Sequence, residues 1–257
     1  MIIDGRELEA RWWGPGPDQA ATLVLLHEGL GSVALWRDFP EVLAAATGCG
    51  VLAYSRFGYG ASDPVTLPRP MSYMHDEALE VLPRVLDAAG LRRAALIGHS
   101  DGGSIAAIYA GAVRDPRVVG VVMLAAHFFV EDLNIASIRG IKETYEHGDL
   151  RVRLARYHRD VDVAFRGWND AWLDFRFREF DITAQVAQIQ VPVLALQGAD
   201  DPYGSDEQLR VLERAVRCSI ETRLIDDARH SPHLEAREAT MQAIVPFIRS
   251  VLMEATV

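Results

Sequence analysis

The sequence predicts an α/β fold with a mostly parallel central sheet and helices on both faces. Short apolar runs alternate with helix-length segments along most of the 257 residues, which is the pattern of successive βαβ units. One of these runs leads directly into Gly98-His99-Ser100-Asp101-Gly102 and then into small and apolar residues. This order indicates a strand, a sharp turn and a helix, with a serine at the end of the strand.

Composition narrows the class of protein. With 49% hydrophobic residues the chain can bury one large core, and no window reaches the ~18 apolar residues of a membrane span. The charged N-terminus does not resemble a signal peptide, and Cys49 and Cys218 imply no disulfide framework, so we expect a cytoplasmic protein. A net charge of −10 argues against nucleic acids and anionic membranes as partners. No motif supports a metal or another cofactor, and none predicts an oligomeric state.

Local pattern places the elements along the chain. Two antiparallel strands are expected first, ended by the turn-forming cluster Gly14-Pro15-Gly16-Pro17, and a parallel series follows. Helices are expected over 33–46 and 72–89, the second kinked near Pro83. The expected strands lie, in order, at 1–4, 8–13, 22–26, 50–54, 94–97, 118–125, 191–196 and 220–225.

The alternation stops between 127 and 190, where charged and aromatic residues increase. We interpret this segment as a helical lid inserted after the sixth strand, over the carboxyl edge of the sheet. Most of its aromatic residues are expected to pack into a small core of their own. The α/β core is then formed by 1–126 and 191–257.

Three polar residues follow three different strands. A serine becomes a nucleophile when a base takes its proton and a third group orients that base. Ser100 is the expected nucleophile, and an acid, Asp200 or Asp201, follows the strand at 191–196. Of the two histidines after the last strand, His230 is preferred over His233 because it comes first in the loop. His233 is expected at the pocket rim or as a helix cap.

An oxyanion formed at the serine needs two converging N–H groups. One is expected from Asp101, at the start of the helix after the serine. The second is expected from Gly29, or otherwise Leu30, in the glycine-containing loop that follows the strand at 22–26. The residues expected to line the substrate pocket are Glu28, Leu30, His127, Phe128, Trp168 and Trp172.

Taken together, these residues resemble the α/β-hydrolase superfamily over nearly the whole chain. The family order is serine, acid, histidine, and its usual acid position favours Asp201 over Asp200. The loop from Ser55 to Asp63 is similar to the family's Asp-x-x-Gly-x-Gly-x-Ser loop, and Ser100-Asp101-Gly102-Gly103 is most similar to the biphenyl-hydrolase-like, or valacyclovir-hydrolase, branch. Three positions depart from the pattern: the family usually has glycine, aspartate and glycine where this chain has Glu28, Ser55 and Arg229.

The resemblance implies a serine hydrolase that cleaves carboxylic esters of small acyl groups through an acyl-enzyme. In the resembling branch the acid after the nucleophile contacts a substrate amine, so α-amino acid esters are one expected class, recognised by Asp101 and Glu28. Otherwise Asp101 caps its helix, and Glu28 faces solvent or an arginine. The alternatives are a thioesterase, a perhydrolase or a carbon–carbon bond hydrolase with the same triad, and a ligand-binding module without catalysis.

Overall fold

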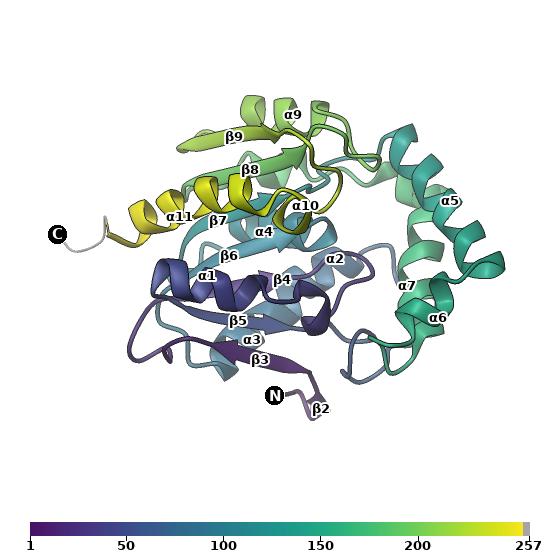
Figure 1. The fold of residues 1–257 in the computed structure, drawn as a ribbon, viewed down its shortest axis with the longest axis horizontal. Helices are drawn as coiled ribbons and strands as arrows, with labels where there is room; N and C mark the ends of the chain where they lie inside the picture. The colour runs from purple at the N-terminus through teal and green to yellow at the C-terminus, as the bar shows by residue number, and fades with distance from the viewer. Residues whose placement is uncertain (254–257) are drawn as a thin grey trace.

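A twisted sheet of seven strands forms the centre of the computed structural model, which describes residues 1–253 (Figure 1). All neighbouring strands are parallel except the first pair, in which β3 runs antiparallel to β5. The predicted α/β fold with a mostly parallel sheet is therefore confirmed. Across the sheet the strands are β3 (Ala10–Trp13), β5 (Gly50–Tyr54), β4 (Thr22–Leu26), β6 (Ala94–His99), β7 (Val118–Leu124), β8 (Val193–Gly198) and β9 (Ile220–Ile225).

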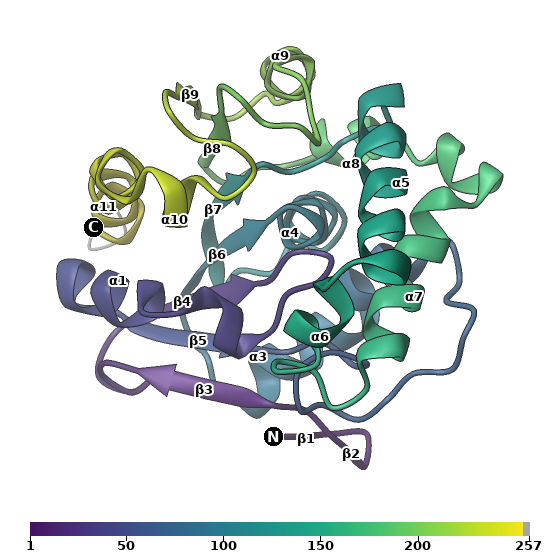
Figure 2. The ribbon, with the colours of Figure 1, turned by 45° about the vertical axis from the view of Figure 1, so that its right-hand side comes forward.

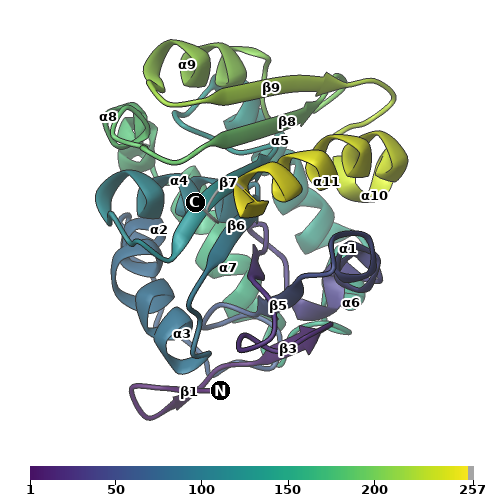
Figure 3. The ribbon, with the colours of Figure 1, turned by 90° about the vertical axis from the view of Figure 1, so that its left-hand side faces the viewer.

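Helices cover both faces of this sheet (Figures 2 and 3). Strand side chains alternate between the two faces, so that Leu23 and Leu25 of β4 join one apolar core while Val24 and Leu26 join the other. All five β4 residues are buried, as expected for the centre of a parallel sheet. One face carries α1 (Phe39–Thr47), α10 (Pro232–Glu235) and α11 (Arg237–Met253); the other carries α3 (Leu82–Ala88), α4 (Asp101–Ala112) and α9 (Glu207–Ala215).

A further group of helices, here called the helical layer, stands beyond the carboxyl ends of the strands (Figure 1). Several of its aromatic rings pack on one another: Tyr145 stacks on Phe165 at 3.6 Å, and Phe177 on Phe180 at 5.1 Å, between ring centroids. Within residues 1–253 no helix combines the length and apolar character needed to cross a bilayer. The layer consists of α5 (Asp132–His147), α6 (Leu150–Leu154), α7 (Val161–Leu173) and the 3₁₀ turn η3 (Phe175–Glu179). The short helix α8 (Thr183–Val186) follows and packs against α4 and α9.

The first strands pair differently from the expectation. Asp4 and Gly5 both have positive φ, 51° and 78°, and so form a tight two-residue turn. That turn pairs β1 (Ile2–Ile3) with β2 (Arg6–Glu7). The chain then leaves this hairpin, and β3 pairs with β5 instead. The expected antiparallel pairing of 1–4 with all of 8–13 is therefore wrong beyond Leu8.

Both helices predicted in the first half are interrupted. The segment 33–46 begins as a 3₁₀ turn, η1 (Val33–Trp36), and breaks at Arg37, whose φ is 55°, before α1 starts. The segment 72–89 divides into α2 (Tyr73–Asp76), a π-helical turn η2 (Glu77–Val81) and α3. Pro83 lies in the first turn of α3 and lacks the N–H that would continue the helix, so the interruption predicted near it is confirmed.

Candidate active site

Ser100 lies on the sharp turn between β6 and α4 with φ 52° and ψ −119°, a backbone conformation that is strained for a residue with a side chain. Glycines allow the turn to be this tight. A Cβ at Gly98 would collide with the carbonyl of Gly102, and a Cβ at Gly102 with the carbonyl of Leu26. The turn therefore places the Ser100 hydroxyl at the carboxyl end of the sheet and at the start of α4.

The predicted acid and histidine meet this serine. His230 Nε2 lies 2.9 Å from Ser100 Oγ, and His230 Nδ1 lies 2.9 and 3.0 Å from the two carboxylate oxygens of Asp201. A carboxylate only accepts, so Nδ1 carries the proton and Nε2 is left to accept from the serine hydroxyl. The three side chains form one continuous hydrogen-bonded chain.

The acid beside His230 is Asp201, and Asp200 is exposed. Asp201 accepts a hydrogen bond from the Tyr203 main-chain N–H at 2.8 Å. Burial raises the pKa of Asp201, but hydrogen bonding to His230 and the attraction of its charge outweigh burial and hold this pKa below its usual range. Asp201 is thus ionised at neutral pH, as a group that orients a histidine must be.

The loop after β4 has its carbonyls turned away from the serine. The buried Arg56 guanidinium donates to the carbonyls of His27 and Glu28, and His27 Nδ1 donates to the Glu28 carbonyl at 2.6 Å. Among the described residues, the main-chain N–H groups of Gly29, Leu30 and Asp101 have no hydrogen-bond partner. Free N–H groups beside the serine are the property an oxyanion site requires.

The Asp101 side chain is completely buried, and protein groups occupy both its oxygens. It accepts from the Tyr73 hydroxyl at 2.6 Å and from Trp172 Nε1 at 3.3 Å, and the Arg56 guanidinium lies 3.9 Å away. The expectation that the Asp101 side chain caps its helix is not met, because its oxygens accept from Tyr73 and Trp172 and not from the helix main chain. Its carboxylate instead connects the helical layer to the turn that carries Ser100.

A cavity of about 110 Å³ opens over Ser100. Of the residues expected to line it, Glu28, Leu30, His127, Trp168 and Trp172 do so, together with Ile138 and Tyr203, which sequence analysis did not identify. Phe128 does not line it. Its side chain is buried in the apolar core, because its main chain is held by the Gln208 side chain and by the Ile182 N–H.

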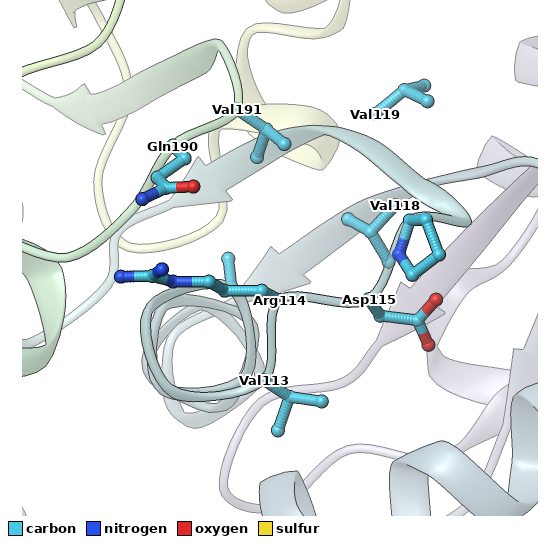
Figure 4. Close-up of a pocket in the computed structure, with 9 residues that line it drawn as sticks. Val113, Arg114, Asp115, Val118, Val119, Gln190 and Val191 are labelled. Carbon is cyan, nitrogen blue, oxygen red and sulfur yellow. The ribbon is translucent and has the colours of Figure 1, made fainter.

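A second, larger hollow of about 370 Å³ lies at the opposite end of the sheet, where β7 and β8 begin (Figure 4). Its lining includes Val113, Val118 and Val191, with Arg114 and Asp115 at its margin. The Asp115 carboxylate is already bonded to Arg117 and to the Tyr109 hydroxyl. None of the described residues that line this hollow is a serine, cysteine or histidine.

Two of the three positions that depart from the family pattern, Ser55 and Glu28, have side-chain partners. Ser55 Oγ accepts from the Val33 N–H at 2.9 Å and donates to the Glu9 carboxylate at 2.6 Å. Glu9 thereby supplies a carboxylate next to a position where the family usually has one. Arg229 is exposed, and Glu28 faces His99. His233, expected at the rim or as a cap, is buried against Trp36 and Phe39.

The helical layer is hydrogen-bonded to the loops that form the site. Asn134 at the start of α5 donates to the carbonyl of Tyr203, two residues after Asp201. His158 Nε2 donates to the carbonyl of Leu30 at 3.0 Å, and Trp172 reaches Asp101. Sequence analysis did not identify Asn134, His158, Tyr73 or Arg56, because their partners are distant in sequence and no local pattern marks them.

Comparison with known proteins gives a consistent result. A model of the alpha/beta hydrolase family matches residues 23–243. The chain is 20% identical to 3-oxoadipate enol-lactonase 1 of Acinetobacter baylyi, covering 92% of this chain and 91% of that protein. It is 27% identical to the carboxylesterase YbfK of Bacillus subtilis, covering 91% and 82%. A crystal structure of a hydrolase from Pseudomonas aeruginosa PA01 superposes with a TM-score of 0.73 at 21% identity, covering 96% of each chain.

The tight turn predicts the effect of one added methyl group. Gly102→Ala should lower the free energy of unfolding by about 3 kcal/mol, because the Cβ meets the main-chain carbonyl of Leu26 and backbone cannot rotate away. The matched control is Gly140→Ala in the exposed part of α5, where a Cβ meets nothing within 4 Å. That change should raise stability by about 0.5–1 kcal/mol. Urea denaturation of both variants measures the difference, and equal stabilities would contradict the close approach.

Proposed function

The chain belongs to the alpha/beta hydrolase family, and we propose that it is a serine hydrolase that cleaves carboxylic esters of small acyl groups through an acyl-enzyme intermediate. The observation that carries this proposal is the unbroken chain of hydrogen bonds from Asp201 through His230 to Ser100. In it, the His230 imidazole is oriented to take the proton of a hydroxyl that faces a cavity. The relatives named as an enol-lactonase and a carboxylesterase support ester bonds as the substrate.

The proposed reaction has two halves. His230 Nε2 takes the Ser100 proton while Oγ bonds to the ester carbonyl carbon, and the N–H groups of Asp101 and Gly29 stabilise the resulting oxyanion. His230 then gives the proton to the leaving alkoxide, which departs as the alcohol. A water molecule repeats the sequence on the acyl-enzyme, and the products are a carboxylic acid and the free serine.

The lining of the cavity favours a small, uncharged acyl group. Trp168, Trp172 and Ile138 provide most of the apolar wall. The relatives named as an enol-lactonase and a carboxylesterase favour an ester over the thioester alternative. In this proposal the segment 127–190, which contains the helical layer, acts as the lid over the core formed by 1–126 and 191–257.

The surroundings of Asp101 argue against recognition of a substrate amine. Its carboxylate is inaccessible and accepts from Tyr73 and Trp172. A substrate ammonium would have to displace these donors and lie near the positive charge of Arg56. Glu28 is likewise engaged, by His99. We therefore propose simple acyl esters, in preference to α-amino acid esters.

Removing the nucleophile tests the proposal directly. Ser100→Ala should lower kcat for p-nitrophenyl esters of short acids by on the order of 10⁶ while the circular-dichroism spectrum stays unchanged. A fluorophosphonate probe should label the wild type and not this variant. Ser250→Ala, a change at an exposed serine of α11, serves as the control and should behave as the wild type. Hydrolysis retained by Ser100→Ala would overturn the proposal.

The adjacent aspartates provide a matched pair. Asp201→Asn should lower kcat by on the order of 10⁴, because an amide can hold His230 in the wrong tautomer and cannot balance its charge. Asp200→Asn changes an exposed side chain and should leave kcat within about twofold. Steady-state kinetics on one ester measures both. A loss in the Asp200 variant with normal Asp201 kinetics would reverse the assignment.

A pair of esters tests the acyl preference. The L-valine and 3-methylbutanoate esters of one alcohol differ only in the amine. We expect kcat/KM for the valine ester to be equal to or below that for the deamino ester, because the nearby carboxylates already have partners. Hydrolysis rates of each ester, measured from limiting to saturating concentrations, give the two kcat/KM values. A preference of tenfold or more for the valine ester would show that an amine is recognised after all.

A further inference from the structure

Glu28 and His99 form a pair beside the nucleophile that the proposed hydrolytic steps do not use. Glu28 Oε2 lies 3.4 Å from His99 Nδ1, and the His99 side chain is 2% exposed. The loop leaves room for this carboxylate, because a Cβ at Gly31 would collide with it. His99 is the residue immediately before Ser100, and Glu28 is the residue immediately before Gly29.

The other ring nitrogen of His99 contacts the loop of the base. His99 Nε2 lies 2.7 Å from the main-chain carbonyl oxygen of His230. A carbonyl only accepts, so Nε2 carries a proton, and Nδ1 faces a carboxylate, which favours a proton there too. Burial opposes charge on both partners, yet each holds the other ionised: the pKa of His99 is raised and that of Glu28 is well below its usual range.

Other titratable groups surround His99. Asp201 contributes attraction from the loop after β8, and the rings of His230 and His233 lie 5.2 and 4.8 Å from that of His99. Burial, and then the charge of His99, keep the pKa of His233 well below its usual value. His233 is therefore neutral, and the positive charge behind the serine resides on His99.

We propose that His99, held in place by Glu28, is a positioning residue that fixes His230 through its main-chain carbonyl and so aims the imidazole at Ser100. The pair joins the loops that follow β4, β6 and β9, which carry the oxyanion donors, the nucleophile and the base. The inference rests on the proposed function, because the effect is on hydrolysis. The proposal adds to Ser100, His230 and Asp201 a fourth residue, His99, that orients the base.

The pair gives a defined dependence on pH. Because the pKa of His99 is raised on folding, its contribution to stability is complete below its unfolded pKa, near 6.5, and is lost as pH rises through the folded value. The contribution of Glu28 is present above its unfolded pKa and is lost as pH falls through the folded one. Loss of the Nδ1 proton turns a lone pair toward the carboxylate, so kcat should decline on the alkaline side.

Two substitutions separate the hydrogen bond from the volume of the ring. The amide nitrogen of His99→Gln can occupy the place of Nε2 and still donate to the His230 carbonyl, whereas that of His99→Asn corresponds to Nδ1 and cannot reach it. We expect His99→Asn to lower kcat by about 10- to 100-fold with KM within about twofold, and His99→Gln to lose less than a fifth as much. Equal losses in both variants, or no loss in His99→Asn, would overturn the proposal.

The charge is tested without relying on activity. In Glu28→Gln the pKa of His99, followed by NMR of the imidazole carbons, should fall by at least one unit, and the alkaline decline of kcat should disappear. Glu143→Gln is the control, because Glu143 faces His147 at 3.7 Å on the exposed side of α5; neither quantity should change. An unaltered His99 pKa in Glu28→Gln overturns the inference and leaves the proposed function in place. Activity retained by Ser100→Ala overturns the proposed function.

Discussion

The close approach of strand β6 to helix α4 is the constraint on which the site depends. Gly98 allows β6 to approach the main chain of Gly102 in α4, and Gly102 allows α4 to approach the carbonyl of Leu26 at the end of β4. Ser100 lies between these contacts, in a conformation with positive φ. A similar contact recurs at Gly198, where a Cβ would collide with the carbonyls of Ala228 and Arg229. The loops carrying Asp201 and His230 can therefore pack on each other, and the distances across the triad follow from backbone packing.

Compensation of buried charge is the second organising feature. Arg56 is 1% exposed and Asp101 is inaccessible, and isolated ions in such positions would be strongly destabilising. Arg56 donates to the carbonyls of His27 and Glu28, and Asp101 accepts from Tyr73 and Trp172. Because their partners come from different segments, these buried polar groups specify one arrangement of the loops. The pair formed by Glu28 and His99 extends the same arrangement behind the nucleophile.

How far the sequence predicts the molecule depends on the range of each interaction. The parallel sheet and the turn at Ser100 are encoded locally, by apolar runs and by glycine spacing, and they were predicted correctly. Asp201 and His230 were identified because each follows a strand. The break at Arg37 and the transfer of β3 to β5 were not predicted, since both are decided by tertiary packing.

The same limit applies inside the site. Trp172 was expected in the pocket, but its bond to Asp101 depends on how α7 crosses the sheet, which no periodicity reveals. Phe128 was misplaced because side-chain alternation past the end of β7 could not be assigned without the strand boundary. Glu9 was overlooked since its partner Ser55 is distant in sequence. Polar residues that follow strands can thus be predicted from the sequence. The side chains that hold them in place are identified only from the structure.

The bond from Trp172 to Asp101 affects how a molecule can enter the cavity. Moving α7 away would leave the buried Asp101 carboxylate short of a donor, at a cost of about 1–3 kcal/mol, and the bonds from His158 and from Asn134 of α5 hold the neighbouring segments to the loops of the site. Rotating individual side chains at the cavity opening costs less free energy than displacing the whole helical layer. Entry past individual side chains would limit the cross-section of a molecule that can reach the cavity.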